Sequence, residues 1–167
     1  ILHYLGGDVD GVSSIASKLS PVGAEVDDQS MSTIRFKNGV VGYVGSCWTS
    51  PGIFSTRVFA QEGLMHFELD FASWDEPENL HKSSSLYIQR GKGGYGLRED
   101  LKMFSGNMFQ DELEIFAEAC RSGSATKLTA HDGNVAVAMV YAALKSVENN
   151  AVMVSVDKVM SEASAEI

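Results

Sequence analysis

Alternating apolar and polar positions are the clearest pattern in the first half of the chain. Residues 31–36 alternate, and an apolar return segment covers 40–48 after the turn Lys37-Asn38-Gly39. Asn-Gly between two such segments predicts a β-hairpin, because both turn positions accept positive φ angles. A second hairpin is expected from 55–60, a turn at 61–63, and 64–69. Further strands are expected at 9–19, with a bulge at Gly11, and at 85–90 and 151–156.

Apolar residues recur at helical spacing in two later segments. The first helix is expected from about Phe109 to Gly123, after a cap at Asn107, and the second from about 129 to 147. Thr129-x-x-Asp132 predicts a capping box for the second helix. Residues 135–144 are apolar nearly all round, which predicts a buried helix. Residues 70–84 and 91–96 are expected to be loops.

The chain opens on what resembles the last turn of an amphipathic helix. Ile1, Leu2, Tyr4 and Leu5 are apolar, and Gly6-Gly7 supplies a C-cap. We therefore expect the chain to be the C-terminal part of a longer protein, whose remaining chemistry lies upstream of Ile1.

Strands come first in the chain and the main helices come after them. This order predicts an α+β fold with an open, mostly antiparallel β-sheet and helices packed on one face. One domain is expected over 1–158, followed by a polar tail at 159–167. The uncovered face of the sheet carries large apolar side chains, which predicts a homo-oligomer formed through that face.

Composition narrows the class of partner. The 167 residues carry 13 basic and 22 acidic side chains, a net charge of −9. Nucleic acids and anionic membrane surfaces attract the opposite charge, so neither is expected as a partner, and a small polar ligand fits better. No run of 18 apolar residues and no signal-peptide pattern occurs, so a cytoplasmic location is expected.

The cysteines and histidines indicate no metal chemistry. Cys47 and Cys120 are expected to be buried free thiols, although a disulfide stays open as an alternative. The four histidines are scattered, without a C-x-x-C or His-x-His cluster. We therefore expect no metal site.

One glycine motif suggests a dinucleotide site and is rejected. Residues 91–96, Gly-Lys-Gly-Gly-Tyr-Gly, match G-x-G-x-x-G after an expected strand. A phosphate-binding loop must open a helix whose N-terminus faces the pyrophosphate. Here Glu99 and Asp100 stand where the phosphates would lie, so a flexible loop is the better interpretation.

The order of these pieces resembles the C-terminal domain of the Gfo/Idh/MocA family (glucose–fructose oxidoreductase and inositol dehydrogenase). The resemblance runs from Leu2 to about Val156. It is carried by Leu2-His3-Tyr4-Leu5-Gly6-Gly7-Asp8-Val9, by Asp27-Asp28 with the hairpin 33–42, by Val58-Phe59-Ala60-Gln61-Glu62-Gly63-Leu64, and by the helices 109–123 and 133–146. Ala60 stands where the family usually has a glycine.

The resemblance implies hydride transfer between a nicotinamide, NAD or NADP, and a sugar, cyclitol or similar alcohol. In this family an N-terminal Rossmann domain holds the cofactor. A lysine from that domain, with an Asp and a His on the connecting helix, handles the hydroxyl proton. We expect those catalytic residues upstream of Ile1, and no cofactor on this chain alone; His3 lies too close to Gly6-Gly7 to be the catalytic His.

What remains for this chain is the wall of a substrate pocket. A polyol needs hydrogen-bonding groups and an aromatic face, and the candidates for binding it are Tyr95, Trp48, Arg57 and Lys92. Each has a structural alternative: Trp48 as sheet core or dimer contact, and Arg57 as a solvated strand charge. The pair Asp27-Asp28 is interpreted as solvated charge at a strand edge, with an acid–base dyad as the alternative.

The leading hypothesis is therefore the substrate-binding and oligomerisation domain of an NAD(P)-dependent oxidoreductase. The chain alone is expected to be inactive. The alternatives are a non-catalytic carbohydrate-binding or dimerisation module, and the C-terminal domain of another Rossmann-linked reductase of the dihydrodipicolinate reductase type.

Overall fold

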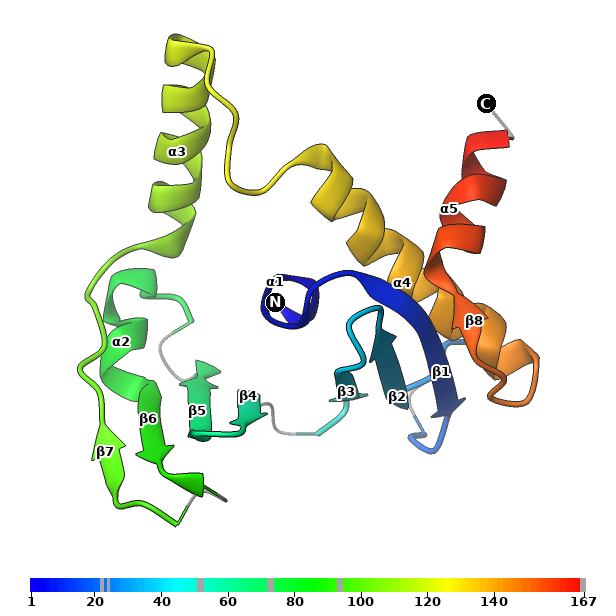
Figure 1. Cartoon of the computed structure of the whole chain (residues 1–167), viewed down its shortest axis with the longest axis horizontal. Helices are drawn as coiled ribbons and strands as arrows, with labels where there is room; N and C mark the ends of the chain where they lie inside the picture. Colours follow the sequence, from blue (N-terminus) through cyan, green and yellow to red (C-terminus); the bar gives the residue numbers. More distant parts are fainter. Residues whose placement is uncertain (22, 24, 51–52, 72–73, 93–94, 166–167) are drawn as a thin grey trace. The chain divides into compact units, whose positions relative to one another are not determined.

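The computed structural model describes residues 1–21, 23, 25–50, 53–71, 74–92 and 95–165. The chain forms two compact units: unit 1 comprises Ile1–Ser50 and Lys127–Ile167, and unit 2 comprises Pro51–Thr126. Each unit contains one four-stranded sheet in which every pairing is antiparallel. The predicted α+β class with antiparallel strands and packed helices is confirmed (Figure 1).

Unit 1 is a sheet in the order β3-β2-β1-β8 with helix α4 packed along β1. Its elements are α1 (Leu2–Gly6), β1 (Val9–Ser17), β2 (Gln29–Phe36), β3 (Val41–Cys47), α4 (Ala130–Glu148), β8 (Val154–Ser155) and α5 (Val156–Ala165). The predicted bulge is present, since the register shifts between Val9 and Gly11. A Cβ on Gly11 would lie 2.9 Å from the carbonyl oxygen of Val154, so glycine lets β8 approach.

The first hairpin forms where the alternation predicted it, but its turn differs in detail. Gly39 donates its N–H to the Phe36 carbonyl, and Phe36 donates to the Val40 carbonyl. Only Gly39 has a positive φ, 90°, while Asn38 does not. The Asn38 side chain instead bonds the backbone, accepting from Val40 N and donating to Gly6 O. The asparagine therefore acts through its amide group.

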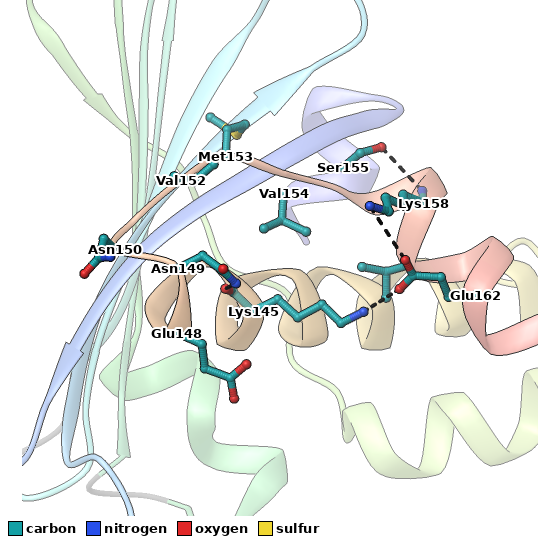
Figure 2. Close-up of a pocket in the computed structure, with 11 residues that line it drawn as sticks. Lys145, Glu148, Asn149, Asn150, Val152, Met153, Val154, Ser155, Lys158 and Glu162 are labelled. Carbon is teal, nitrogen blue, oxygen red and sulfur yellow. Dashed lines mark hydrogen bonds and ion pairs between the residues drawn. The ribbon is translucent and has the colours of Figure 1, made fainter.

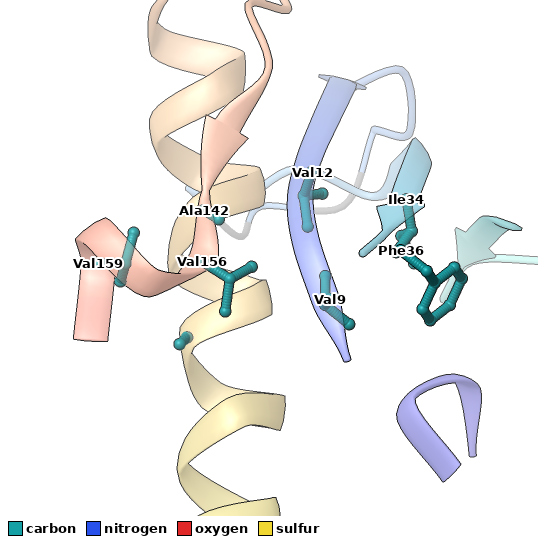
Figure 3. Packing of buried hydrophobic residues seen from close by; sticks show 8 residues of the cluster. Val9, Val12, Ile34, Phe36, Ala142, Val156 and Val159 are labelled. Carbon is teal, nitrogen blue, oxygen red and sulfur yellow. The ribbon is translucent and has the colours of Figure 1, made fainter. Parts of the chain in front are cut away.

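The core of unit 1 lies between one face of its sheet and the helices α4 and α5 (Figure 3). Alternate strand positions supply Val12, Ile34 and Phe36, all at most 3% exposed. Ala142 on α4 is fully buried and leaves room for the strands to approach. A hydrogen bond crosses this layer, from Ser14 N to Ser146 Oγ at 2.9 Å, and satisfies two buried polar groups.

Helix α4 is not buried on all sides, contrary to the sequence-based expectation. Its capping box between Thr129 and Asp132 is present, as predicted. One stripe is buried, whereas the opposite side exposes large apolar residues: Val137, Val140, Tyr141 and Leu144. A single sheet covers only one side of a helix. The burial of α4 was therefore overestimated from its uniformly apolar sequence.

The C-terminal segment also differs from expectation. The strand expected at 151–156 shrinks to Val154–Ser155, and α5 then continues to Ala165, where a polar tail was expected. Val156 and Val159 are 1% and 8% exposed and belong to the core (Figure 3). The burial of these two valines anchors the helix.

Unit 2 is a sheet in the order β4-β5-β6-β7. Its elements are β4 (Ile53–Ala60), β5 (Gly63–Asp70), the 3-10 helix η2 (Pro77–Asn79), α2 (Leu80–Ser83), β6 (Ser85–Arg90), β7 (Arg98–Asp100) and α3 (Met108–Ser122). The predicted hairpin β4-β5 is confirmed. The expected loop at 70–84 contains α2, whose Leu80 is buried, and β7 was not predicted.

Helix α3 begins and ends near the predicted residues. The Asn107 side chain accepts from Phe109 N and Gln110 N, and Gly123 ends the helix with φ 70°. The Gln110 side chain bonds Glu114 and does not complete a capping box. No residue of α3 is buried, and Phe109 makes an edge contact with Trp74 at 5.9 Å between ring centres.

Candidate functional site

A hollow in unit 1 lies where α4, β8 and α5 meet (Figure 2). It has a volume of about 580 Å³, and Lys145, Lys158 and Glu162 supply its charges at the α5 end. Both lysines contact the Glu162 carboxylate, at 2.5 and 3.9 Å. Hydrogen bonding to Lys145 lowers the pKa of Glu162. With Glu148, which also lines the hollow, two positive and two negative side chains balance, and no residue predicted to bind substrate lines this hollow.

Unit 2 has a different feature, a polar row across one face of its sheet. Directly paired residues on neighbouring strands place their side chains on the same face. By register, Arg57 on β4 pairs with His66 on β5, His66 with Tyr87 on β6, and Tyr87 with Asp100 on β7. The opposite face of the same strands is apolar, with Val58, Met65 and Ile88 in one row.

His66 is the buried member of this row, at 7% exposure. Its Nδ1 lies 2.8 Å from the Tyr87 hydroxyl. Its Nε2 is buried and has no hydrogen-bond partner among the described residues. The Glu68 carboxylate lies 3.7 Å from Nε2, beyond hydrogen-bonding distance. An unpaired buried polar atom of this kind is rare in folded proteins.

Tyr87 is held from both sides. Its ring centre lies 4.9 Å from that of His66, and the Arg98 guanidinium carbon lies 4.1 Å above the ring. Arg98 is itself held by Asp100 at 2.5 Å. The order Asp100, Arg98, Tyr87, His66 therefore forms a continuous set of contacts that fixes the tyrosine hydroxyl against the imidazole.

The four residues predicted to bind substrate are all exposed. Arg57 lies in the polar row and makes no hydrogen bond or ion pair within the described part of the chain. Lys92 and Tyr95 lie in the loop after β6, and Tyr95 is 93% exposed. Trp48 follows β3 in unit 1, and its indole N–H donates to the Asp27 carbonyl at 3.1 Å.

Two further interpretations from the sequence are corrected. Asp28 is 3% exposed, so it is not a solvated edge charge. Its carboxylate accepts from Leu19 N and Ser20 N. The Ser20 amide is the main cause that lowers the pKa of Asp28. Alternating polarity could not show this, because the amides lie eight and nine residues upstream.

Both cysteines are free and exposed, whereas burial was expected. Cys47 ends β3, and its sulfur lies 3.1 Å from Ser50 Oγ and 3.5 Å from Thr49 Oγ1. Hydrogen bonding from the Ser50 side chain, then from Thr49, lowers the pKa of Cys47 to about 7. The signal in the sequence was the pair of hydroxyl residues, Thr49 and Ser50, two and three positions after Cys47.

The segment after the glycine motif does not fit a dinucleotide site; residues 93 and 94 of the motif lie outside the described residues. This segment forms strand β7 and not a helix, and β7 contains Glu99 and Asp100. Helix N–H groups facing the phosphates are therefore missing here, and the carboxylates would repel them. No three His, Cys, Asp or Glu side chains cluster within the described ranges to hold a metal.

Within the described part of the chain, no helix is both long enough and apolar enough to span a bilayer.

Comparison with known family models gives a match over the first part of the chain. Residues 1–66 match the family model described as the GFO/IDH/MocA C-terminal domain. A search of curated proteins gives no match.

Solved structures share the fold over nearly the whole chain. A proposed NADPH-dependent oxidoreductase from Desulfitobacterium hafniense is 25% identical with a TM-score of 0.83, covering 95% of this chain and 45% of that one. Aldose-aldose oxidoreductase from Caulobacter crescentus, complexed with glycerol, is 19% identical with a TM-score of 0.73, covering 92% and 43%. Levoglucosan dehydrogenase with NADH and L-sorbose is 19% identical with a TM-score of 0.69, covering 93% and 46%.

The chain thus spans less than half of the length of each of these three proteins. The partial sequence match and the shared fold confirm the resemblance inferred from the motifs: this chain has the fold of a Gfo/Idh/MocA C-terminal domain.

Proposed function

We propose that this chain is the substrate-binding and oligomerisation domain of an NAD(P)-dependent oxidoreductase acting on a sugar, cyclitol or related alcohol. The observation that carries the proposal is the match of fold and sequence to one part of such enzymes. Related structures hold NADH with levoglucosan, or NAD⁺ with L-tartaric acid and magnesium. The cofactor and the proton-handling groups would come from residues outside this chain.

Substrate binding would fall to exposed polar and aromatic side chains. Arg57 has an unpaired guanidinium among the described residues, and Tyr95, Lys92 and Trp48 are accessible to a ligand. Guanidinium and ammonium groups donate to hydroxyl oxygens, and aromatic faces pack against the C–H groups of a sugar ring. These four residues remain our proposal for part of the pocket wall.

Oligomerisation would use the open face of the unit 1 sheet. Ile15 on β1, Met31 on β2 and Tyr43 on β3 lie on the face opposite α4, and they are 63%, 52% and 64% exposed. Exposed apolar groups of this size favour association with another surface. The same observation supports the alternative function, a dimerisation module without catalytic activity.

The test compares this chain with the protein encoded by its full reading frame. NADH and NADPH are titrated against each, and the longer protein is assayed on a panel of sugars and polyols. We expect cofactor binding and turnover only for the longer protein. Tight cofactor binding by the 167-residue chain would contradict the proposed division of roles, and a reading frame without any further domain would favour the dimerisation module.

A further inference from the structure

His3 on α1 lies between two hydrogen-bond acceptors. Its Nδ1 is 3.1 Å from the carbonyl oxygen of Gly7, and its Nε2 is 3.3 Å from a carboxylate oxygen of Asp132 on α4. The side chains of His3 and Asp132 are 22% and 29% exposed, so water screens this ion pair only in part. The imidazole therefore joins the end of α1 to the first turn of α4, two elements that are far apart in the chain.

A neutral imidazole cannot satisfy both of these acceptors. It carries one N–H group, so its other ring nitrogen would turn a lone pair toward an oxygen. The imidazolium ion donates through both nitrogens, and its charge is opposite to that of the Asp132 carboxylate. Two donors then face two acceptors, so the observed arrangement suits the protonated form of His3.

Asp132 is held in place independently of His3. Its other carboxylate oxygen accepts from the backbone N–H and from the hydroxyl of Thr129, each at 2.7 Å. These bonds, and then the bond from His3, lower the pKa of Asp132, so the carboxylate keeps its charge in mildly acidic solution. The first turn of α4 is thus a fixed acceptor, and the imidazole is the partner whose charge changes between about pH 5 and 8.

Helix α1 has few other attachments to unit 1. It comprises five residues, and none of them is buried. Asn38 donates to the Gly6 carbonyl at 2.8 Å, and Leu2 packs against the core. A helix of this length is unstable in water by itself, so its helical turn depends on such contacts. The loss of one contact should therefore be visible in α1 while the core stays folded.

Other titratable groups near α1 are placed differently. Strand β3 also packs against α1, where Leu2 lies beside Gly42, and it has no charged side chain. Cys47 is five residues further along β3, about 16 Å away. Aspartate, lysine and tyrosine keep their charge states between about pH 5.5 and 8. The groups of these kinds around α1 are Asp8, Tyr4, Tyr43 and Lys37 with its partner Asp157, and His131 is the neighbouring histidine on α4.

We propose that His3 is a pH-sensitive clasp that fastens α1 to the first turn of α4. Below about pH 6 the imidazolium binds the Gly7 carbonyl and the Asp132 carboxylate together and holds α1 in place. At about pH 8 the neutral ring keeps one of the two bonds, and α1 frays. The inference concerns this chain by itself and does not depend on the proposed function.

The test records NMR spectra of the 167-residue chain at about pH 5.5 and 8. The ¹⁵N shifts of the His3 ring report its protonation, and the ¹³Cα shifts of residues 2–6 report the helical population of α1. We expect an imidazolium and a helical α1 at the lower pH. At the higher pH the ratio of helical to frayed α1 should fall about fivefold. Unchanged signals of Val12 in the core show that unit 1 stays folded.

The variant His3→Gln keeps a donor but cannot gain a proton, so the helical population of α1 should be the same at both pH values. His131→Gln is the matched control, because His131 is exposed and precedes Asp132. It should keep the full pH response, and the amino terminus of the chain is the same in every variant. About 1 M NaCl should reduce the helical population of α1 at the lower pH in the unmodified chain and leave His3→Gln unchanged.

Three results would overturn the inference: an α1 that is equally helical at the two pH values, a pH response in His3→Gln equal to that of the unmodified chain, or a loss of the response in His131→Gln. Each of these leaves the proposed function undecided, because that depends on cofactor-dependent turnover by the longer protein.

Discussion

At the scale of single residues, the structure explains charged and polar groups by their backbone neighbours. Asp28 stands out, since a carboxylate at 3% exposure without a cation among the described residues needs other partners. It finds them in the amides of Leu19 and Ser20, just after β1. Asp28 also bonds through its backbone, because its carbonyl oxygen accepts the backbone N–H of Trp48.

The Asp28 carboxylate should make stability depend on pH. The Ser20 amide lowers its pKa below the ordinary value of 3.8 in the folded state. This contribution is present above the unfolded pKa and is lost as pH falls through the lowered folded pKa. Asp28→Asn should be less stable near neutral pH and should lose less stability below about pH 5, measured by chemical denaturation. Asp27→Asn leaves the bonds of Asp28 in place, so its stability should fall with pH as steeply as that of the unmodified chain. Identical stability–pH profiles for both variants would contradict the role given to Asp28.

Cys47 should react with alkylating agents faster than an exposed thiol with an ordinary pKa does. A pKa lowered from 9.0 to about 7 leaves about half of the thiol as thiolate near pH 7. The lower nucleophilicity of such a thiolate offsets part of that gain, so alkylation should be about fivefold faster than for an unperturbed thiol. Ser50→Ala removes the main donor and should slow iodoacetamide labelling of Cys47, as measured by peptide mass spectrometry. Exposed Cys120 is the internal reference, and an unchanged Cys47 rate in the variant would refute the role of Ser50.

At the scale of elements, the alternating side chains of strand β2 separate into a core face and an open face. Ile34 points into the core of unit 1 at 2% exposure, and Met31 lies on the open face at 52%. The two residues share a strand but lie on different faces, because they are three positions apart and successive side chains alternate between the faces. The same strand therefore stabilises unit 1 with one side and offers the other for association.

Substitutions on the two faces of β2 should have very different effects. Ile34→Ala removes packed core atoms and should lower the free energy of unfolding by about 2–5 kcal/mol. Met31→Ala should change it by no more than about 0.5 kcal/mol. Chemical denaturation followed by circular dichroism measures both. Equal losses would mean that the open face is covered, either within the chain or by a second copy of it.

At the scale of the whole molecule, two units each contribute one antiparallel sheet, and a large apolar surface stays exposed. In unit 1 this surface comprises the sheet face opposite α4 and the outer side of α4. In unit 2 no residue of α3 is buried. A chain that spans less than half of its structural relatives and exposes this much apolar area is suited to pack against further protein.

Self-association through the open sheet face should respond to a charge placed there. Tyr43→Glu should reduce the mass measured by light scattering from that of an oligomer to that of a monomer, because a buried unpaired carboxylate disfavours the interface. Leu19→Glu alters an apolar residue outside the sheet that is more exposed than Tyr43, at 77% against 64%, and should leave the mass unchanged. A monomeric unmodified chain, or an oligomer that persists in Tyr43→Glu, would exclude this interface.

Most residues of the polar row in unit 2 could not be predicted from the sequence, for a specific reason. Arg57 was identified from its place on a predicted strand. His66, Glu68 and Tyr87 were missed, because pairing between β5 and β6 crosses the segment 71–84 and no local turn sets that register. Polar residues at alternate positions of β5 were visible, but their partner strand was not.

The local features of this protein follow from its amino-acid sequence alone: the two hairpins, the caps at Asn107 and Thr129, and the glycine that ends α3. Each depends on residues within a few positions of one another, so local hydrogen bonds and turn geometry are sufficient to specify it. The packing of distant segments, in contrast, sets which side of α4 is buried, extends a helix to Ala165, and encloses Asp28 and His66. Burial depends on the surfaces that distant segments present to one another, and hydrophobic spacing alone does not carry that information.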